Sequence, residues 1–514
     1  MSVITVDEPR AETYVRVGTL ADEEFFLLKK IKSRQAVIAV IGLGYVGLPL
    51  AVTFAEAGFR VVGLDVDRRR VDSLNEGQSY ISDIAAERLT PLLKPLVTSN
   101  GRLMPLTANG HSHGSSLMIE GNGARGRQPA SRAGSLSATT DYNVLFDADA
   151  VIICVPTPLD ATKEPDMSYI VAAVDEIAHR LHPGMLIVLE STTYPGTTEE
   201  ILLPRLQQAA PRRYGFSNGN GSHAAGLSPM VVGRDFFLAF SPERIDPGRT
   251  DWTVRTTPKV IGGVTHDCLQ VAQALYGAAI ETVIPVSCPK TAEMVKLLEN
   301  TFRAVNIGLI NEMALICDQL GIDVWEVIRA ASTKPFGFMP FYPGPGLGGH
   351  CIPIDPQYLA WKLKTLNYSA RFIQLAADIN FAMPHYVLSK VISALNGHGK
   401  PVSGSNILLL GVAYKADVGD VRESPAMDLI ALLQAMNADV TYSDPHVPGL
   451  TVDGLPMTSI ALTEAALEAA DCAVIVTAHT EYDWPWIVEH SQLIVDTRNA
   501  TRDVVALPGQ VVRL

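Results

Sequence analysis

Residues 36–65 read AVIAVIGLGYVGLPLAVTFAEAGFRVVGLD, and this stretch decides the fold of the N-terminal part of the chain. The β-branched run Val37–Ile41 stops at a glycine, and a second apolar run, Arg60–Leu64, ends at Asp65. The uncharged residues 36–55 would be long enough to cross a membrane. A β-branched run, a glycine turn, an apolar helix and a second run are instead typical of a buried βαβ unit. We therefore expect no membrane interaction.

The glycines of this stretch form the pattern GxGxxG between the predicted strand and helix. The first glycine permits a tight turn, the second lets the backbone approach a pyrophosphate, and the third lets the helix pack closely. The helix N-terminus then faces the anion. An acid at the end of the second strand accepts hydrogen bonds from both ribose hydroxyls and repels a 2′-phosphate. The pattern predicts an NAD site made by Gly42, Gly44, Tyr45, Val46, Gly47 and Asp65.

Composition limits the remaining possibilities. At 514 residues the chain is long enough for about three domains. Its 41 Lys and Arg against 54 Asp and Glu, a net charge of −13, argue against a general nucleic-acid or anionic-membrane binder. The N-terminus lacks the apolar core of a signal peptide. The six cysteines form no CxxC pair, which favours reduced thiols and a cytoplasmic protein.

We expect an α/β fold with two Rossmann-like doubly wound domains joined by a long-helix central domain. Short apolar runs at 150–155 and 185–189 indicate further strands of the first domain, and a long helical pattern over 289–331 is interrupted at Gly321. Strands at 406–410, 439–442, 472–477 and 493–495 and a helix at 425–436 follow the linker NGHGKPVSGS. The expected parts are an extension, 1–34, a first Rossmann domain, 35–240, a helical domain, 241–396, and a C-terminal Rossmann-like domain, 397–514.

Two segments rich in glycine and serine, 107–138 and 213–230, are expected to be exposed insertions. They contain His111, His113 and His223, but no carboxylate or thiol is spaced to complete a chelating set. We therefore expect no metal site.

A thiol lies in the glycine- and proline-rich segment 342–356, YPGPGLGGHCIPIDP. Glycines allow close backbone approach to Cys351, and Asp355 follows four residues later, so a catalytic nucleophile and a simple turn are equally compatible with this composition. The other five cysteines lie in apolar runs and are expected in the core. On the long helix, a stripe on one face is either a pocket wall or a solvated surface, and it consists of Glu293, Lys296, Asn300 and Arg303. The loop SPERIDPG adds Glu243, Arg244 and Asp246.

The motifs IGLGYVGLPLA, CVPTPL, ESTTYPGTT, AFSPERIDPG, KLLENTFRAVNI, GPGLGGHCIPIDP and YKADVGDVRESPA occur in this order along the chain. With these motifs the chain resembles the nucleotide-sugar 6-dehydrogenase family, which includes UDP-glucose 6-dehydrogenase and its UDP-N-acetylhexosamine relatives. The resemblance implies an NAD-binding domain, a helical dimer-forming core with the cysteine loop and a C-terminal UDP-binding domain. It also implies oxidation of a sugar C6 alcohol to a carboxylate with two NAD, and an assembly that is a homodimer or a larger homo-oligomer.

The resemblance also implies a role for each matching residue. Cys351 is the nucleophile, Lys296 and Asn300 stabilise oxyanions, and Asp355 assists proton transfer and water activation. Thr192 and Glu243 position water or relay protons, with Thr193 as an alternative because STTYP is one residue longer than the usual STVP. Cofactor contacts are expected from Pro156, Thr157, Ser191 and Thr192, and substrate contacts from Glu243, Arg244, Lys296, Asn300, Gly348 and Arg422. Lys415 and Asp420 lie in the same loop as Arg422, which suits a diphosphate.

Two departures point to a branch of this family. Pro247 stands where UDP-glucose enzymes often have a second glutamate, and the loop GGHCIPID lacks their lysine. Both departures resemble the N-acetylhexosamine branch, so UDP-N-acetylglucosamine is the favoured substrate, with UDP-glucose and UDP-N-acetylmannosamine as alternatives. Outside the family, a two-electron hydroxy-acid dehydrogenase would need no thiol, and a non-catalytic binder would not need the Cys351, Lys296 and Asp355 set.

Overall fold

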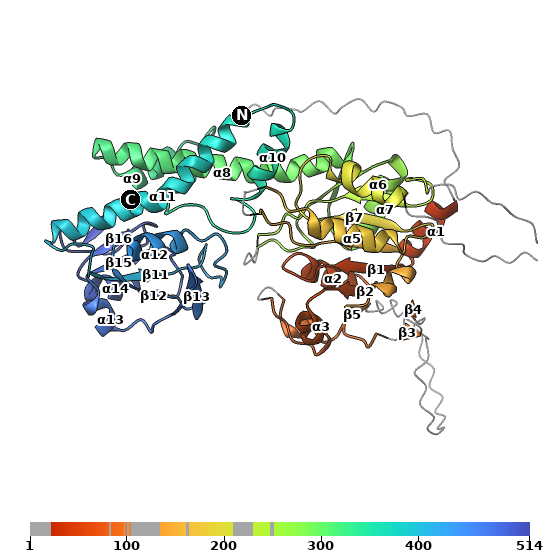
Figure 1. The fold of residues 1–514 in the computed structure, drawn as a ribbon, viewed down its shortest axis with the longest axis horizontal. Coiled ribbons are helices and arrows are strands. Elements are labelled where there is room, and N and C mark those ends of the chain that lie inside the picture. Colours follow the sequence, from red (N-terminus) through yellow and green to blue (C-terminus); the bar gives the residue numbers. More distant parts are fainter. Residues whose placement is uncertain are drawn as a thin grey trace, which may run out of the picture.

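The computed structural model describes residues 22–81, 84–96, 98–99, 102–103, 134–160, 164–208, 230–246 and 251–514. Two lobes, each built on a mainly parallel sheet, are connected by the long helix α8 (Pro289–Leu320) (Figure 1). The structure confirms the expected α/β class, with two Rossmann-like sheets joined by long helices.

The first lobe contains an eight-stranded sheet with the order β10-β9-β8-β7-β6-β1-β2-β5. All neighbours pair in parallel except β8 and β9. The central strand β1 lies between β2 and β6, so the strand order reverses here, and ligands of such sheets bind beyond the carboxyl ends at this point. The strands are β1 (Val37–Ile41), β2 (Arg60–Leu64), β5 (Ser135–Thr139), β6 (Ala150–Ile153), β7 (Leu186–Leu189), β8 (Phe237–Phe240), β9 (Lys259–Gly263) and β10 (Val283–Val286).

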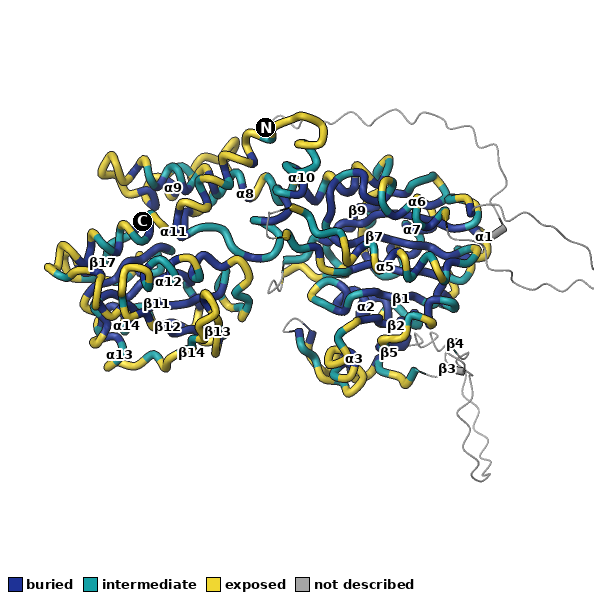
Figure 2. Tube along the Cα trace, in the orientation of Figure 1, coloured by how far each residue is buried: buried dark blue, intermediate teal, exposed yellow. Residues whose placement is uncertain are grey.

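Helices cover both faces of this sheet because its strands are apolar on both sides. Ile38 and Val40 of β1 belong to one buried cluster, whereas Ala39 and Ile41 belong to the other, as the two-residue period of a strand requires. Figure 2 shows the central strands of both large sheets as buried. The remaining elements are α1 (Asp22–Lys32), α2 (Gly47–Glu56), α3 (Arg68–Asn75), α4 (Ala86–Leu89), η1 (Tyr142–Asp147), α5 (Ser168–Ala178), η2 (Thr198–Leu202), α6 (Leu203–Gln207), α7 (His266–Tyr276) and the hairpin β3 (Thr98–Ser99) with β4 (Arg102–Leu103).

Two sequence-based boundaries need correction. The first sheet continues through β9 and β10 to residue 286, beyond the expected domain end at 240. These strands are short, and the edge strand β10 contains Pro285, a residue that weakens a strand prediction. The insertion 107–138 overlaps β5, whose sequence SLSAT has no long apolar run. The rest of that insertion, most of 213–230 and His111, His113 and His223 lie outside the described residues.

Long helices form the central part. α8 has 32 residues and is therefore about 48 Å long. It ends at Gly321, where φ is +66°, as the sequence predicted. α11 (Arg371–Gly397) packs along α8, and the buried Asn311 amide donates to the Asn380 side chain at 2.9 Å. The helices α9 (Val324–Ala331) and α10 (Asp355–Lys364) complete this part.

The second lobe contains a parallel sheet with the order β12-β11-β15-β16-β17, which reverses between β11 and β15. Its strands are β11 (Asn406–Leu410), β12 (Asp439–Ser443), β15 (Cys472–Ile475), β16 (Ile494–Asp496) and β17 (Val511–Arg513). The first four lie within two residues of the predicted strands, whereas β17 was not predicted. The hairpin β13 (Gly449–Val452) and β14 (Leu455–Thr458) and the helices α12 (Pro425–Ala435), α13 (Glu464–Ala469) and α14 (Trp484–His490) surround them.

Among the helices in the described part of the chain, none combines the length and the apolar character that a bilayer crossing requires.

Candidate active site

A cavity of about 500 Å³ lies where the two lobes and α8 meet. The glycine turn, the ends of β6, β7 and β8, one face of α8, the cysteine loop and two loops of the second lobe all contribute to its wall. Its volume is in the range of small-molecule sites. The expected site residues that line it are Gly44, Tyr45, Val46, Pro156, Thr157, Ser191, Thr192, Glu243, Arg244, Lys296, Asn300, Gly348, Cys351 and Arg422.

The glycine turn has the shape that a dinucleotide pyrophosphate needs. Gly42 has a φ of +91°, and a Cβ on Gly47 would lie 1.8 Å from the carbonyl oxygen of Gly42. These two glycines shape the turn without lining the cavity, whereas Gly44 lines it and has nothing within 4 Å of its Cβ position. A phosphate can therefore reach the backbone at Gly44 and the N-terminus of α2.

Asp65 supports the turn from behind. Its Oδ2 accepts the N–H of Leu43 at 2.9 Å, and its Oδ1 accepts the N–H of Asp67 at 2.9 Å. Asp65 is buried and is not part of the cavity wall. Arg70, whose guanidinium lies 3.4 Å from Asp65 Oδ2, does line the cavity. The expected ribose contact of Asp65 therefore stays a prediction.

The cysteine loop places the thiol directly before α10. The N–H of Asp355 donates to the carbonyl oxygen of Cys351 at 2.8 Å, and the Asn300 amide of α8 donates to the Asp355 carboxylate. Lys296 lies one turn before Asn300 and is also buried. Asp355 is not itself in the cavity wall; it lies behind Asn300.

Burial and neighbouring charges set the protonation states here. The pKa of Cys351 is raised to about 11, first by burial and then by the Asp355 carboxylate, while Lys296 opposes the rise. Burial raises the pKa of Asp355 to about 6, against the effects of Lys296 and the Asn300 bond. Burial alone lowers the pKa of Lys296, but Cys351 and Asp355 more than reverse this. Lys296 is therefore a fixed cation beside the thiol, able to stabilise an oxyanion together with Asn300.

The predicted polar stripe on α8 is a pocket wall for three of its four members. Lys296, Asn300 and Arg303 line the cavity. Glu293 does not, because it lies at the N-terminal end of α8 beneath the turn before η2. There its carboxylate accepts the N–H of Thr198 at 2.9 Å and the N–H of Gly196 at 2.5 Å.

The two threonines that the sequence could not separate lie in different environments. Thr192 lines the cavity, whereas Thr193 is 1% exposed and shares a hydrogen bond with the Thr197 hydroxyl at 2.5 Å. The geometry therefore favours Thr192. Its neighbour Ser191 donates to the carbonyl oxygen of Val155 at 2.8 Å.

The SPERIDPG loop contributes a fixed carboxylate. Glu243 Oε1 accepts the N–H groups of Arg244 at 2.8 Å and Ile245 at 2.6 Å. The Arg244 guanidinium pairs with Glu299 of α8 at 2.6 Å, so part of its charge is neutralised within the protein. Asp246 pairs with Lys415 of the second lobe at 2.7 Å, which joins the two lobes across the cavity.

The loop after β11 closes the cavity from the second lobe. The Arg422 guanidinium binds Asp420 and lies 5.3 Å from the centre of the Tyr45 ring, on the glycine turn. The N–H of Gly349, in the cysteine loop, donates to the carbonyl oxygen of Arg422 at 3.0 Å. A Cβ on Gly348 would lie 2.7 Å from the Tyr414 Cβ, so the close approach of the two loops requires this glycine.

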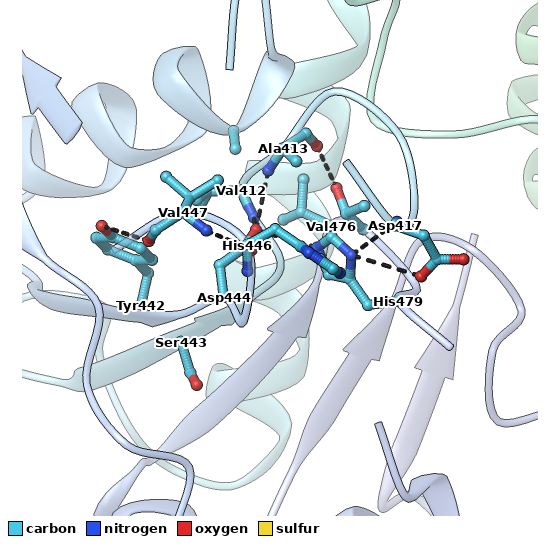
Figure 3. A network of polar contacts seen from close by, with 12 residues as sticks. Val412, Ala413, Asp417, Tyr442, Ser443, Asp444, His446, Val447, Val476 and His479 are labelled. Carbon is cyan, nitrogen blue, oxygen red and sulfur yellow. Dashed lines mark hydrogen bonds and ion pairs between the residues drawn. The ribbon is translucent and has the colours of Figure 1, made fainter. Parts of the chain in front are cut away.

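A buried histidine holds the loop after β11 in place, as Figure 3 shows. His479 Nδ1 accepts the N–H of Asp417 at 3.0 Å, and its Nε2 lies 3.0 Å from Asp444 Oδ2. The same Asp444 oxygen accepts the N–H groups of Val412 at 2.7 Å and Ala413 at 3.1 Å. Asp417, His446 and His479 lie close enough to chelate an ion. Both ring nitrogens of His479 are already hydrogen-bonded, so we interpret the group as an anchor for the loop.

Arg498, Glu190 and Lys259 are among the polar residues in or beside this cavity that were not predicted from the sequence. Arg498 follows β16 and lines the cavity, and burial lowers its pKa to about 10. Glu190 follows β7 and also lines the cavity, and Lys259 begins β9 beside it. The available signal for the first two was their place directly after a parallel strand, where ligand-binding residues gather.

Four segments of the chain together match the three domains of one family. The NAD binding domain of the UDP-glucose/GDP-mannose dehydrogenase family matches residues 36–107 and 112–280, its central domain 290–382 and its UDP binding domain 408–503. The chain is 35% identical to the UDP-N-acetyl-D-mannosamine dehydrogenase of Salmonella typhi, over 90% of this chain and 99% of that protein. The chain belongs to the UDP-glucose/GDP-mannose dehydrogenase family.

Two further members of the UDP-glucose/GDP-mannose dehydrogenase family match this chain over nearly their whole length. The NDP-N-acetyl-D-galactosaminuronic acid dehydrogenase of Ralstonia nicotianae is 34% identical over 90% of this chain and 95% of that protein. The structure of the UDP-D-ManNAc dehydrogenase of Pyrococcus horikoshii superposes with a TM-score of 0.73 at 30% identity, over 93% of this chain and 98% of that chain. The predicted family is confirmed, and the chain is an NAD-dependent UDP-sugar dehydrogenase.

Proposed function

We propose that this protein oxidises the C6 alcohol of a UDP-N-acetylhexosamine to the carboxylate, in two successive two-electron steps at Cys351. The observation that carries the proposal is the position of Cys351 in one cavity with the glycine turn and the loop of Arg422. A thiol there can hold the sugar between the two oxidations. A two-electron alcohol dehydrogenase would have no use for it.

NAD, when bound, accepts the hydride of each oxidation. Between the oxidations, the Cys351 sulfur bonds to the aldehyde carbon and the thiol proton passes to the aldehyde oxygen, which forms a thiohemiacetal. Loss of a hydride and a proton converts this adduct to a thioester. Water then adds to the thioester carbon, the carbon–sulfur bond breaks, and the thiol is regenerated with the carboxylate product.

The neighbouring side chains support these steps. Lys296 and Asn300 donate to the C6 oxygen while it carries negative charge. Asp355, with a pKa of about 6, takes and returns protons near neutral pH. Burial raises the pKa of Glu243, but Lys259 and Lys296 lower it overall, so Glu243 is an ionised acceptor for the attacking water, with Thr192 as a second water contact.

The two ends of the cavity suit the two nucleotides. Gly44, Tyr45 and Val46 would hold the NAD pyrophosphate, with Pro156, Thr157 and Ser191 along the dinucleotide and Asp65 at its ribose. Arg422, Lys415 and Arg498 from the second lobe would meet the UDP diphosphate, since arginine binds phosphate oxygens in a bidentate manner. Arg244 and Gly348 complete the wall beside the sugar.

The identity of the sugar is the most specific part of the proposal. The loop departures at Pro247 and GGHCIPID support the N-acetylhexosamine class. The relatives named above are UDP-N-acetyl-D-mannosamine and NDP-N-acetyl-D-galactosaminuronic acid dehydrogenases, which supports the same class. Within it, we propose UDP-N-acetylglucosamine first. A kcat/KM ranking of that sugar against UDP-N-acetylmannosamine, UDP-N-acetylgalactosamine and UDP-glucose decides the order.

Product stoichiometry tests the function. Wild-type protein with excess NAD should form two NADH for each sugar consumed, together with the uronate. Cys351→Ala should form no uronate, while a matched Cys317→Ala variant, changed at a buried thiol of α8, should keep the two-to-one ratio. A ratio of one NADH per sugar, or uronate from Cys351→Ala, would contradict the proposal.

We also propose a homodimer that pairs through α8. Five exposed apolar side chains recur at spacings of four, seven, seven and four residues and so form one stripe on this helix: Leu298, Phe302, Leu309, Ile316 and Leu320. A contiguous exposed apolar surface of this kind marks a protein interface.

The need for a free Cys351 further supports a reducing, cytoplasmic location.

A further inference from the structure

A buried lysine lies between two buried glutamates behind the cavity wall. Lys259 Nζ is 2.7 Å from Glu190 Oε2 and 3.4 Å from Glu243 Oε2. The three residues are 4%, 1% and 8% exposed. Both glutamates line the cavity, whereas the lysine does not. The lysine can therefore affect the reaction only through its neighbours.

Every carboxylate oxygen of this group has a partner. The Tyr276 hydroxyl on α7 donates to Glu190 Oε1, and Lys259 donates to Glu190 Oε2. Glu243 Oε1 accepts two backbone N–H groups, which leaves Oε2 for Lys259. Substituting Lys259 would leave one oxygen of each glutamate without its charged partner in a buried place.

The unusual strand direction creates this arrangement. β8 and β9 pair antiparallel, with Phe240 opposite Gly262. Extending that register by three residues sets Lys259, the first residue of β9, opposite Glu243, just beyond the end of β8. Parallel pairing would place the start of β9 at the far edge of the sheet, away from the cavity. Because β8 and β9 pair antiparallel, Lys259 lies at the edge of the sheet where ligands bind.

The pKa shifts of the two glutamates indicate how Lys259 affects each of them. Burial raises the pKa of Glu190, despite the attraction of Lys259. Burial also raises the pKa of Glu243, but Lys259 and then Lys296 outweigh it. The pKa values of two neighbouring carboxyl groups are thus shifted in opposite directions, so the two groups can differ in protonation state at the same pH. The titratable groups that face Glu243 from the surrounding elements are Lys259, Lys296, Glu190, Tyr276, Cys154 and Cys351.

We propose that Lys259 is a positioning residue that keeps Glu243 ionised and aimed at the cavity, with Glu190 and Tyr276 holding the lysine from the opposite side. The proposal rests on the function proposed above, because it concerns the carboxylate that accepts from the attacking water. Lys259 touches neither sugar nor cofactor; it acts through Glu243. The wall therefore presents a negative carboxylate beside the positive Lys296 throughout the working pH range.

The first experiment measures kcat/KM between pH 5 and 9 for the wild type, Lys259→Met and Lys259→Arg. Without the cation, burial should raise the pKa of Glu243 above that of Asp355, the group that sets the wild-type acid limb, so the acid-side fall of kcat/KM in Lys259→Met should move up by about one pH unit or more. The kcat at pH 7 should fall about tenfold or more. Lys259→Arg keeps the charge and should restore the wild-type profile. A Lys259→Met profile that coincides with that of the wild type would overturn the proposal.

A second measurement needs no turnover. The infrared difference spectrum of Lys259→Met against the wild type at pH 7 should show protonated carboxyl absorbance from both glutamates, and the part that belongs to Glu243 should disappear in Lys259→Met/Glu243→Gln. If the pairing of Lys259 with Glu190 were the lysine's whole role, Lys259→Met/Glu190→Gln would remove all of this absorbance and Lys259→Met/Glu243→Gln none of it, and the proposal would be wrong. A wild-type protein that oxidises none of the sugars would refute the proposed function, while the infrared result would still decide the role of Lys259.

Discussion

The Asn300 amide on α8 donates to the Asp355 carboxylate at the start of α10, and this bond connects the long helix to the cysteine loop. Residues 55 positions apart are thereby held at one place, with Lys296 one turn away on α8 and Cys351 one turn before α10. The proposed proton acceptor, the proposed oxyanion donors and the thiol consequently share one rigid support. Rigid elements place such groups more accurately than loops do.

This bond predicts a pH dependence. Asp355 has a pKa of about 6, so it is a carboxylate above this pH and becomes protonated below it. If the carboxylate is the form that accepts the proton, kcat/KM should fall as the pH decreases through about 6. Asp355→Asn should lose this acid limb and about a hundredfold or more of kcat. A pH profile of kcat/KM reports the free enzyme, which is the state described here.

Asn300→Ala is the matched variant for this pH dependence. The Asn300 bond lowers the pKa of Asp355, so its removal should move the acid limb to higher pH. Persistence of the wild-type limb in Asp355→Asn would assign it to another group.

The glycine turn predicts that two similar substitutions both weaken NAD binding but differ in their effect on stability. A Cβ on Gly47 would lie 1.8 Å from a backbone oxygen, which cannot move aside as a side chain can. Gly47→Ala should therefore lower the free energy of unfolding by at least about 1–3 kcal/mol and abolish NAD binding. Gly44→Ala has open space around its Cβ and should keep the wild-type thermal stability, yet weaken NAD binding about tenfold or more because the methyl group occupies the pyrophosphate's approach. Thermal unfolding and NAD titration check both, and equal destabilisation by the two variants would refute this.

The anchor at His479 predicts a defect confined to the nucleotide-sugar end. His479→Phe removes the acceptor for Asp417 and the partner of Asp444, so the loop with Lys415 and Arg422 loses its support. The dissociation constant of UDP should rise about tenfold, since each lost buried hydrogen bond costs about 1 kcal/mol or more. The NAD constant should stay unchanged. Calorimetric titration of both ligands measures this, with His490→Phe, at the end of α14, as the control.

The apolar stripe of α8 predicts the assembly. Leu309 lies at its centre and is 52% exposed, so Leu309→Arg should place a charge within the dimer interface and convert the protein to monomers. Val505→Arg introduces the same charge at an exposed apolar residue outside the stripe and should leave the dimer intact. Light scattering at several concentrations gives the mass directly. A wild-type protein that is monomeric, or a Leu309→Arg protein that still dimerises, would rule out this interface.

Sequence reasoning reached much of this site because its strongest signals are local. The glycines of residues 42–47 act within one turn, and the three-and-four spacing of Lys296, Asn300 and Arg303 follows from helix geometry alone. The same spacing included Glu293 in the stripe, but this buried residue belongs neither to a pocket wall nor to a solvated surface. Helix periodicity predicts the face of the helix on which a residue lies, but not which segment packs against that face. The segment that contacts Glu293 is the turn at 196–198.

By itself, the sequence determined the glycine turn, the loop that holds Cys351 and the long helix, since each depends on contacts between residues close in the chain. Only the tertiary structure decided that Thr192 and not Thr193 faces the cavity, that Arg498 enters it, and that Lys259 stands opposite Glu243. These outcomes depend on strand register and on pairing between charges far apart in the chain. No local pattern encodes them, because their free energy is gained only when distant segments have already packed together.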